Sequence, residues 1–140
     1  MSLPMKKSNS CNNNVWSKAS SVPSSWSVCE GENSKFFRDP EGRIFKSRRL
    51  ALANMISNQA KAEDIKRMRR GLGDEGWISS SLLPPDWWYK FSKDEKQQIE
   101  VITEDGGLLS DLKTIKGFIK EIHSSYYRKF GLFLKTVLKN

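Results

Sequence analysis

Basic side chains are the residues of this sequence whose type and spacing could do chemistry. Six of them lie within residues 35–49 and three more within residues 67–70. Clustered lysines and arginines contact phosphates, which gives affinity without a choice of base sequence and a steep loss of binding with salt. The candidate contact residues are Lys35, Arg38, Arg43, Lys46, Arg48, Arg49, Arg67, Arg69 and Arg70. Ser47 joins them, because the free backbone amides of a helix that starts there would add a phosphate site.

The net charge of +8 is confined to one half of the 140-residue chain. Residues 1–73 carry 14 Lys and Arg against 6 Asp and Glu, whereas residues 74–140 carry 10 against 10. This asymmetry suggests that the first half meets a polyanion and that the second half is structural or faces another protein. Charge alone leaves open a solvated basic surface without any partner.

Catalytic and metal-binding constellations are missing from the sequence. It has one histidine, His123, and no GxSxG motif, Gly-rich phosphate loop or metal-ligand spacing. Cys11 and Cys29 form no CxxC pair, so we expect reduced thiols in an intracellular protein. No run approaches the ~18 apolar residues that a membrane span requires, and residues 1–14 lack the apolar core of a signal peptide. We therefore expect neither an enzyme nor a bound cofactor or metal.

An internal repeat organises the chain. Trp16, Pro23 and Trp26 recur 61 residues later as Trp77, Pro84 and Trp87. Further on, the match continues at an offset of 65, as though the second copy had gained four residues in a loop. At that offset the pairs are Phe37 with Ile102, Asp39 with Glu104, Gly42 with Gly107, and Ile44 with Leu109. The helix that follows aligns at 64 or 65, and the sequence leaves that register open.

Each copy predicts the same order of elements: a strand that begins at the Pro-x-x-Trp, a second strand that ends in a tight hairpin, and a helix. In the first copy the hydroxyl of Ser47 caps a helix that runs to about Ser57. In the second copy the strand covers 99–103, and Ser110 or Asp111 caps the helix.

The strongest helical pattern lies near the end of the chain. Apolar residues recur at three- and four-residue steps from Leu112 to Phe133, which predicts a long helix that Gly131 ends or kinks. Between the copies, residues 60–72 predict a third helix with acidic residues near its start and arginines near its end. The helix dipole favours that charge order, so it has a structural explanation as well as a phosphate-binding one.

These elements predict an α+β fold of two small units, each a short twisted antiparallel sheet with a packed helix. Residues 1–14 are expected to be a disordered tail. The first unit is predicted over 15–59, a basic linker helix over 60–73, and a second, more diverged unit with an extended C-terminal helix over 74–140.

Residues 22–56 resemble the methyl-CpG-binding domain family, including its TAM-type relatives. The resemblance rests on Val22-Pro-x-x-Trp26, on Phe36-Phe37-x-Asp39-Pro40-x-Gly42, and on Phe45-Lys46-Ser47 before an apolar helix. Residues 83–120 resemble the family more faintly, through Leu83-Pro84-Pro85-Asp86-Trp87 and Gly107-x-Leu109-Ser110. The family fold is a small twisted antiparallel sheet with one packed helix, and its hairpin loop enters the DNA major groove.

The resemblance implies DNA binding, but the residues that read methyl-CpG in this family differ here. The family uses two arginines, each forked onto a guanine. Lys46 stands at one of these positions, and residues 27–32 hold no arginine for the other. The family's aspartate falls on Ser34 and its tyrosine on Phe36. We therefore expect a nuclear, monomeric chromatin module that contacts double-stranded DNA through phosphates, without selecting methylated CpG.

The alternative is a protein-interaction scaffold that has kept the fold and recruits a chromatin complex without reading DNA. Trp88 motivates this hypothesis, since adjacent residues on a strand point to opposite faces. If Trp87 belongs to the core, Trp88 faces outward or meets the other copy.

Overall fold

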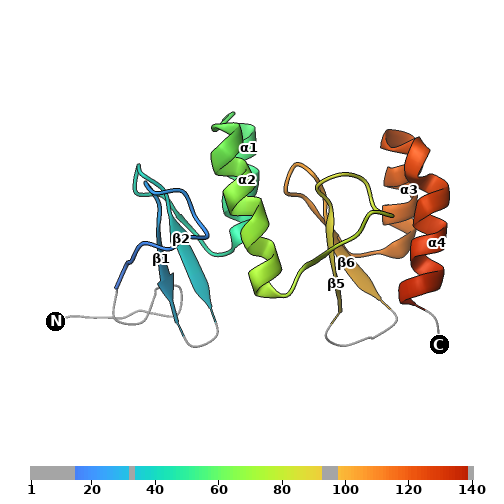
Figure 1. Cartoon of the computed structure of the whole chain (residues 1–140), viewed down its shortest axis with the longest axis horizontal. Coiled ribbons are helices and arrows are strands. Elements are labelled where there is room, and N and C mark those ends of the chain that lie inside the picture. The colour runs from blue at the N-terminus through green and yellow to red at the C-terminus, as the bar shows by residue number, and fades with distance from the viewer. Residues whose placement is uncertain (1–14, 32–33, 93–97, 139–140) are drawn as a thin grey trace. The chain divides into compact units, whose positions relative to one another are not determined.

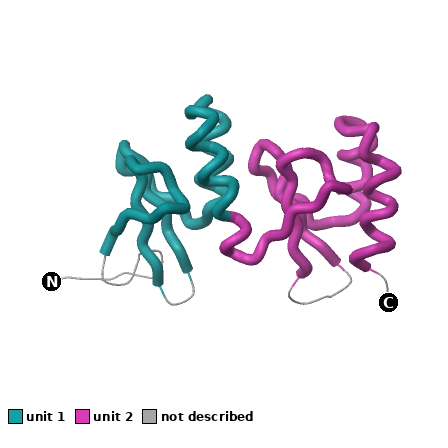
Figure 2. The backbone as a smooth tube through the Cα atoms, viewed as in Figure 1, with its two compact units in different colours: residues 1–71 teal, residues 72–140 magenta. Residues whose placement is uncertain are grey.

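The computed structural model describes residues 15–31, 34–92 and 98–138, so the tail predicted over 1–14 lies outside the described residues. The chain divides into two compact units, Met1–Gly71 and Leu72–Asn140 (Figure 2). Each unit combines an antiparallel sheet with a pair of helices, as the predicted α+β class requires. No helix in the described parts of the chain has the length and apolar character needed to span a membrane.

Unit 1 is built from three strands and two helices (Figure 1). Its sheet has the order β1-β2-β3, formed by β1 (Ser27–Glu30), β2 (Lys35–Arg38) and β3 (Ile44–Phe45). The helices α1 (Arg48–Ser57) and α2 (Ala62–Arg70) follow, and they pack on each other. The segment predicted as a separate linker helix is therefore the second helix of unit 1, because Met68 buries its side chain there.

The hairpin between β2 and β3 owes its shape to Asp39. The Asp39 carboxylate accepts hydrogen bonds from the amides of Glu41 at 3.0 Å and Arg43 at 2.8 Å, and Gly42 takes a left-handed φ of 91° that favours glycine. Burial alone would raise the pKa of Asp39. The hydrogen bonds from Arg43, its charge, and the bond from Glu41 outweigh burial and hold that pKa below its usual range.

The cap of α1 confirms the sequence prediction. Ser47 has an extended backbone, and its hydroxyl accepts a 3.2 Å hydrogen bond from the amide of Leu50. Such a bond satisfies one of the amides that the first turn of a helix leaves without an internal partner. The helix then runs to Ser57, as predicted, and buries Ala51, Leu52 and Met55.

Unit 2 repeats this plan with one more strand. Its sheet has the order β4-β5-β6-β7, formed by β4 (Ile78–Ser79), β5 (Trp88–Phe91), β6 (Ile99–Ile102) and β7 (Leu108–Leu109). The helices are α3 (Leu112–Ile122) and α4 (Tyr127–Val137), joined by a short 3-10 turn over Ser124–Tyr126. A further 3-10 turn, Gly71–Glu75, precedes the sheet. Asp111, rather than Ser110, caps α3 by accepting a hydrogen bond from the amide of Thr114.

The same hydrogen bonds recur in both units. The amide of Trp26 donates to the carbonyl of Pro23, and 61 residues later the amide of Trp87 donates to the carbonyl of Pro84. Beyond the first loop the offset is 64 rather than the predicted 65. The two hairpin glycines with matching φ values are Gly42 at 91° and Gly106 at 89°.

The corrected offset changes which residues are equivalent. The amide of Asp39 donates to the carbonyl of Arg43, and the equivalent bond joins Thr103 to Gly107. Thr103, and not Glu104, is thus the counterpart of Asp39. The loop between the first two long strands, 31–34 in unit 1 and 92–98 in unit 2, gains three residues rather than four.

The long helix predicted from Leu112 to Phe133 is interrupted at His123, eight residues before Gly131. His123 has φ −128° and ψ 54°, which no helix adopts, and it ends α3. Its Nε2 lies 3.2 Å from Glu104 Oε1, the same oxygen that accepts a 2.6 Å hydrogen bond from Trp87 Nε1. Gly131 lies inside α4, where a side chain at its position would meet no neighbour.

The cores of the two units contain the repeated tryptophans. In unit 1 the Trp26 ring stacks on Phe45, with 5.8 Å between ring centres. In unit 2 Trp87 is buried among residues of the sheet and of both helices, including Tyr89 and Phe133. Tyr89 meets Phe133 edge to face at 4.8 Å. Each Pro-x-x-Trp therefore directly precedes a strand and also supplies a core side chain.

The sequence predicted a reduced thiol at Cys29, and this prediction is wrong. Cys29 is buried in unit 1 and disulfide-bonded. The other cysteine of the sequence, Cys11, lies outside the described residues.

Candidate nucleic-acid interface

Arg48 was expected to contact phosphates, but it is a core residue of unit 1. It is 1% exposed, and its guanidinium lies over the Phe37 ring at 4.8 Å. Nη1 donates to the carbonyls of Ser21 at 2.8 Å and Met68 at 3.1 Å. Nη2 donates to the Ser21 hydroxyl at 2.9 Å. With its donors directed inward, Arg48 has no group left for DNA.

The position of Arg48 nevertheless organises the basic surface. It is the first residue of α1, and Met68 lies in the last turn of α2, so their hydrogen bond holds these two helix ends together. Lys46 and Arg49 flank Arg48 in the chain, while Arg69 and Arg70 follow Met68. The structure therefore brings together, at one end of the α1–α2 hairpin, two groups of cations that are about twenty residues apart in sequence.

The exposed face of α2 carries the densest positive charge. Lys66, Arg67 and Arg70 are all exposed, and their spacing of one, three and four residues places them on one side of the helix. Glu63 and Asp64 lie in the first turn and the arginines in the last, as predicted, which complements the helix dipole. In the described part of unit 1, Lys66, Arg67 and Arg70 make no hydrogen bond or ion pair that would neutralise them. Their charges are available to a polyanion.

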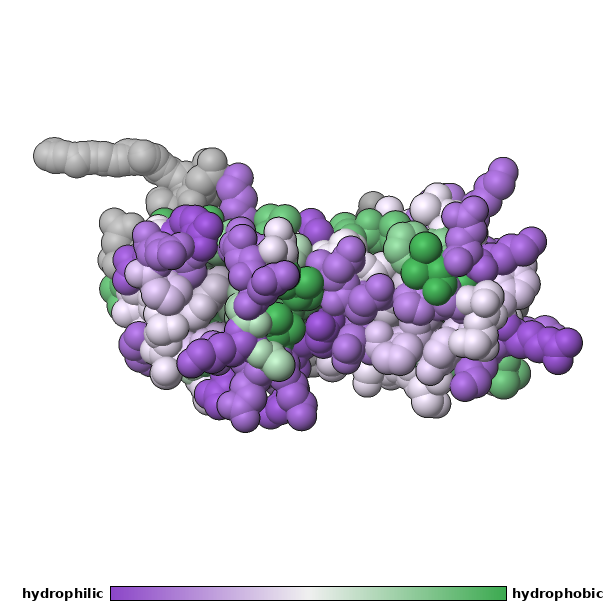
Figure 3. All heavy atoms as spheres, turned by 90° about the horizontal axis from the view of Figure 1, so that it is seen from above, coloured by the Kyte–Doolittle hydropathy of each residue, from purple (hydrophilic) through white to green (hydrophobic). Residues whose placement is uncertain are grey.

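Lys46 and Arg49, at the start of α1, extend this surface in different degrees. Lys46 is exposed, whereas Arg49 is half-buried. The hydroxyl of Ser47 is engaged in capping the helix, so Ser47 contributes through its place at the helix start and not through a free hydroxyl. In the view of Figure 3, hydrophilic side chains cover much of the surface of unit 1, with smaller apolar patches between them.

Lys35 and Arg38 lie on the sheet instead. Lys35 Nζ lies 3.4 Å from Glu30 Oε2, which neutralises part of its charge. The guanidinium of Arg38 covers the ring of Trp16 at 4.5 Å. Arg38 belongs to the face of the sheet that holds Cys29, Phe36 and Trp16, and not to the hairpin of helices. The predicted site is thus divided.

Arg43 is the third separate part of the predicted site. Its Nε donates to Asp39 Oδ2 at 2.7 Å, and its Nη2 lies 2.7 Å from Glu41 Oε1. Two carboxylates therefore compensate one guanidinium, which leaves little attraction for a phosphate.

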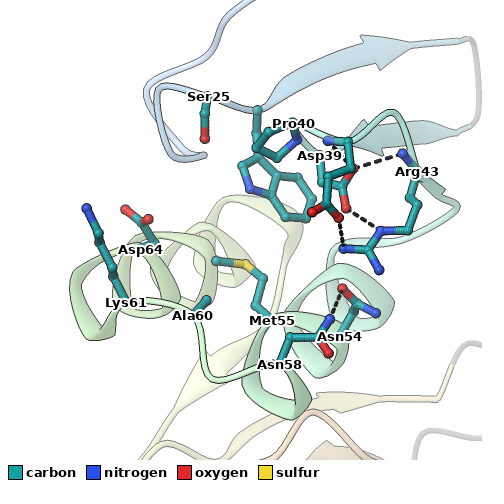
Figure 4. A pocket seen from close by; sticks show the side chains of 12 residues that line it. Ser25, Asp39, Pro40, Arg43, Asn54, Met55, Asn58, Ala60, Lys61 and Asp64 are labelled. Atoms are coloured by element: carbon teal, nitrogen blue, oxygen red, sulfur yellow. Dashed lines mark hydrogen bonds and ion pairs between the residues drawn. The ribbon is translucent and has the colours of Figure 1, made fainter.

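A pocket that the sequence did not predict lies beside this ion pair (Figure 4). It has a volume of about 270 Å³, and Trp26, Met55 and Ala60 supply its apolar lining. Asn58 donates a 3.1 Å hydrogen bond to the Asn54 side chain at its edge. The charged residues around it are Asp39, Glu41, Arg43, Lys61 and Asp64, three carboxylates against two cations, so a polyanion is not attracted there. Its lining comes from four separate segments, which is why no local pattern signalled it.

Trp88 lies where the alternation of strand residues predicts. Trp87 is buried at 1% exposure, and Trp88 points to the other face of the sheet, where it is half-buried. Its ring packs near Gly73, within 3.6 Å of the position that a Cβ would take there. A contact inside unit 2 therefore covers part of the side chain that was expected to bind a partner.

Over the described residues, no three His, Cys, Asp or Glu side chains gather closely enough to hold a metal ion. Comparison of the chain with protein-family models, with curated proteins and with solved structures finds no match.

Proposed function

We propose that this chain is a non-enzymatic nucleic-acid-binding module that contacts the phosphates of double-stranded DNA through the basic end of the α1–α2 hairpin. The observation that carries the proposal is the Arg48–Met68 hydrogen bond, since it joins the cations at the start of α1 to those at the end of α2. The contact residues are Lys46, Arg49, Lys66, Arg67, Arg69 and Arg70.

The proposed contact reads charge and not base sequence. Lys46 carries a single compact ammonium where a forked guanidinium would be needed to read a guanine. The start of α1 adds backbone amides and the positive end of a helix dipole. We expect affinity that falls steeply with salt and does not respond to methylation of CpG steps.

A DNA-binding titration at several salt concentrations tests the proposal, with matched unmethylated and CpG-methylated duplexes. The test variant is Arg67→Gln with Arg70→Gln, which removes two exposed cations from the site. If both contact phosphates, the slope of log K against log salt becomes shallower by about 2, at ~0.9 for each contact. Its melting temperature should stay close to that of the unaltered chain, because both side chains are exposed.

The matched control is Lys113→Gln with Lys116→Gln, two exposed cations of α3 in unit 2. It removes the same charge from a different place. If the control loses as much DNA affinity as the test variant, the proposed contact site is wrong and the loss reflects net charge alone. A preference for methylated duplexes would contradict the phosphate-only contact.

The proposal places the protein with chromatin in the nucleus. The disulfide at Cys29 is more typical of oxidising compartments, so localisation needs its own test. A fluorescent fusion that is excluded from nuclei would contradict the assignment.

A protein-interaction scaffold is the second candidate function. Trp88 supports it less than the sequence suggested, because Gly73 covers part of its ring. The exposed apolar residues Tyr127 and Leu132 of α4 support a protein partner better than Trp88 does.

A further inference from the structure

The second helices of the two units are equivalent. α4 begins at Tyr127, 65 residues after α2 begins at Ala62. The core residue Met68 of α2 corresponds at the same offset to Phe133 of α4, and both are buried. Residues on the outward face of one helix can therefore be compared directly with those of the other.

The outward faces have diverged in chemistry. The exposed charged positions on α2 are Glu63, Lys66, Arg67 and Arg70, and their counterparts on α4 are the exposed Arg128, Gly131, Leu132 and Lys135. The two central positions thus hold long cations in unit 1 but a glycine and a leucine in unit 2. A face suited to phosphates has become one with an apolar centre between two cations.

The centre of the α4 face has no partner within the described residues of unit 2. Leu132 is 55% exposed, and a Cβ added at Gly131 would meet nothing within 4 Å. Glycine lowers the stability of a helix interior, and here no internal packing explains it. A glycine on an exposed helix face does allow a second backbone to approach closely. Tyr127, one turn before Gly131, adds a ring that is 44% exposed.

The charge around this centre is positive. The exposed cations of the helices are Lys113, Lys116, Lys120, Arg128, Lys129 and Lys135, against Glu121 and the capping Asp111. Lys120 of α3 lies 5.9 Å from the ring centre of Tyr127, so α3 contributes charge beside the α4 face. In Figure 3 hydrophilic side chains project from the part of unit 2 that these helices form. An apolar centre with a basic rim is complementary to an apolar helix with an acidic rim.

We propose that the outward face of α4, formed by Tyr127, Arg128, Gly131, Leu132 and Lys135, docks an acidic amphipathic helix of a partner protein. Leu132 is the apolar anchor, and Gly131 allows the incoming helix to lie close. Arg128 and Lys135 lie four residues before and three after Leu132, where they pair with carboxylates on the rim of the partner. A second copy of this chain does not fit, because the same face would oppose cation to cation. This docking is independent of the DNA contact of unit 1.

Titration of the full chain with a synthetic peptide tests the docking. The probe is a fluorescent amphipathic helix with leucines on one face and glutamates on the other, and its control is a peptide of the same composition in scrambled order. In the isotope-labelled protein, the amide signals of Gly131 and Leu132 should shift with the amphipathic peptide and not with the scrambled one. The variant Leu132→Lys should weaken binding by at least roughly tenfold, as expected for an anchor residue.

Ser125→Lys is the matched control, because Ser125 is exposed in the turn between the helices and the substitution adds the same charge. It should bind the peptide at least as well as the unaltered chain, and the melting temperature of both variants should be unchanged. The proposal is overturned if the amphipathic peptide fails to bind or binds no better than the scrambled one. It is also overturned if Leu132→Lys binds as tightly as Ser125→Lys, or if duplex DNA alone shifts the signals of Gly131 and Leu132.

Discussion

Replacing Arg48 with alanine should destabilise unit 1, because Arg48 is a core residue and not a DNA contact. The substitution removes the donors from the buried carbonyl of Met68 and the partly buried carbonyl and hydroxyl of Ser21. A buried acceptor that loses its partner costs about 1–3 kcal/mol, and the contact of the guanidinium with Phe37 is worth about 1 kcal/mol more. The expected loss of unfolding free energy is therefore at least ~3 kcal/mol.

The assay is thermal unfolding followed by circular dichroism, with the variants Arg48→Ala, Arg48→Lys and Lys46→Ala side by side. A loss of ~3 kcal/mol corresponds to a fall in Tm of more than about 12 °C for a domain of this size. Arg48→Lys should recover little of it, since an ammonium cannot reach the carbonyls and the hydroxyl at once. Lys46→Ala should melt within ~0.5 kcal/mol of the unaltered chain. If Arg48→Ala melted like Lys46→Ala, the buried position of Arg48 would be refuted.

Two further predictions concern the hairpin and the helices. Because the folded pKa of Asp39 is depressed, its ionised form stabilises unit 1 above the unfolded pKa of about 3.9, and this stabilisation is lost as pH falls through the folded pKa. Unfolding free energy measured from pH 6 down to pH 2 should therefore fall less steeply in Asp39→Asn, and equal slopes would count against the Asp39–Arg43 pair. Gly42→Ala should lower the free energy of unfolding by about 1–2 kcal/mol, because Gly42 has a left-handed φ. Gly131→Ala should raise it by up to ~1 kcal/mol, because Gly131 lies in an open part of α4. Denaturant titrations compare the two, and a change of the same sign in both would contradict the environments described for them.

Local signals predicted the elements that local physics controls. The Ser47 cap needs only a hydroxyl and the amide of Leu50, three residues away. The turn at each Pro-x-x-Trp needs only a carbonyl and an amide, which is why it recurs unchanged at an offset of 61. The repeat could be recognised in the sequence for the same reason, since large aromatic residues at a fixed spacing are easy to align.

The features that the sequence did not predict depend on contacts between residues that are distant in the chain. Arg48 resembles its exposed neighbour Lys46 in type, and only the carbonyls of Ser21 and Met68 show that it is buried. His123 ends α3 where its ring meets Glu104 and Trp87, two residues that flank the strands of unit 2, in a stretch whose apolar periodicity continues without a break. The hairpin of unit 2 was misaligned by one residue because Glu104 resembles Asp39, whereas Thr103 holds the equivalent place.

The sequence predicted which types of residue form the candidate site but not how those residues are arranged. Nine cations and Ser47 were proposed as one surface, yet Lys35, Arg38 and Arg43 are each engaged elsewhere by Glu30, Trp16 and Asp39. Positive charge in a sequence does not reveal which carboxylate or ring will lie next to it in the fold. On α2 the sequence proposed Arg67, Arg69 and Arg70, whereas the exposed face consists of Lys66, Arg67 and Arg70, and Arg69 is half-buried.

The packing of Arg48 also dictates where the chain can be cut. A side chain at Gly71 would collide with the guanidinium of Arg48, so the last residue of unit 1 must present bare backbone to it. A fragment that ended at Gln59 would lose the Met68 carbonyl and leave a buried guanidinium without one of its acceptors. An autonomous first half must therefore extend through Gly71, and the junction between the halves is set by the core of the first half and not by the composition of a linker.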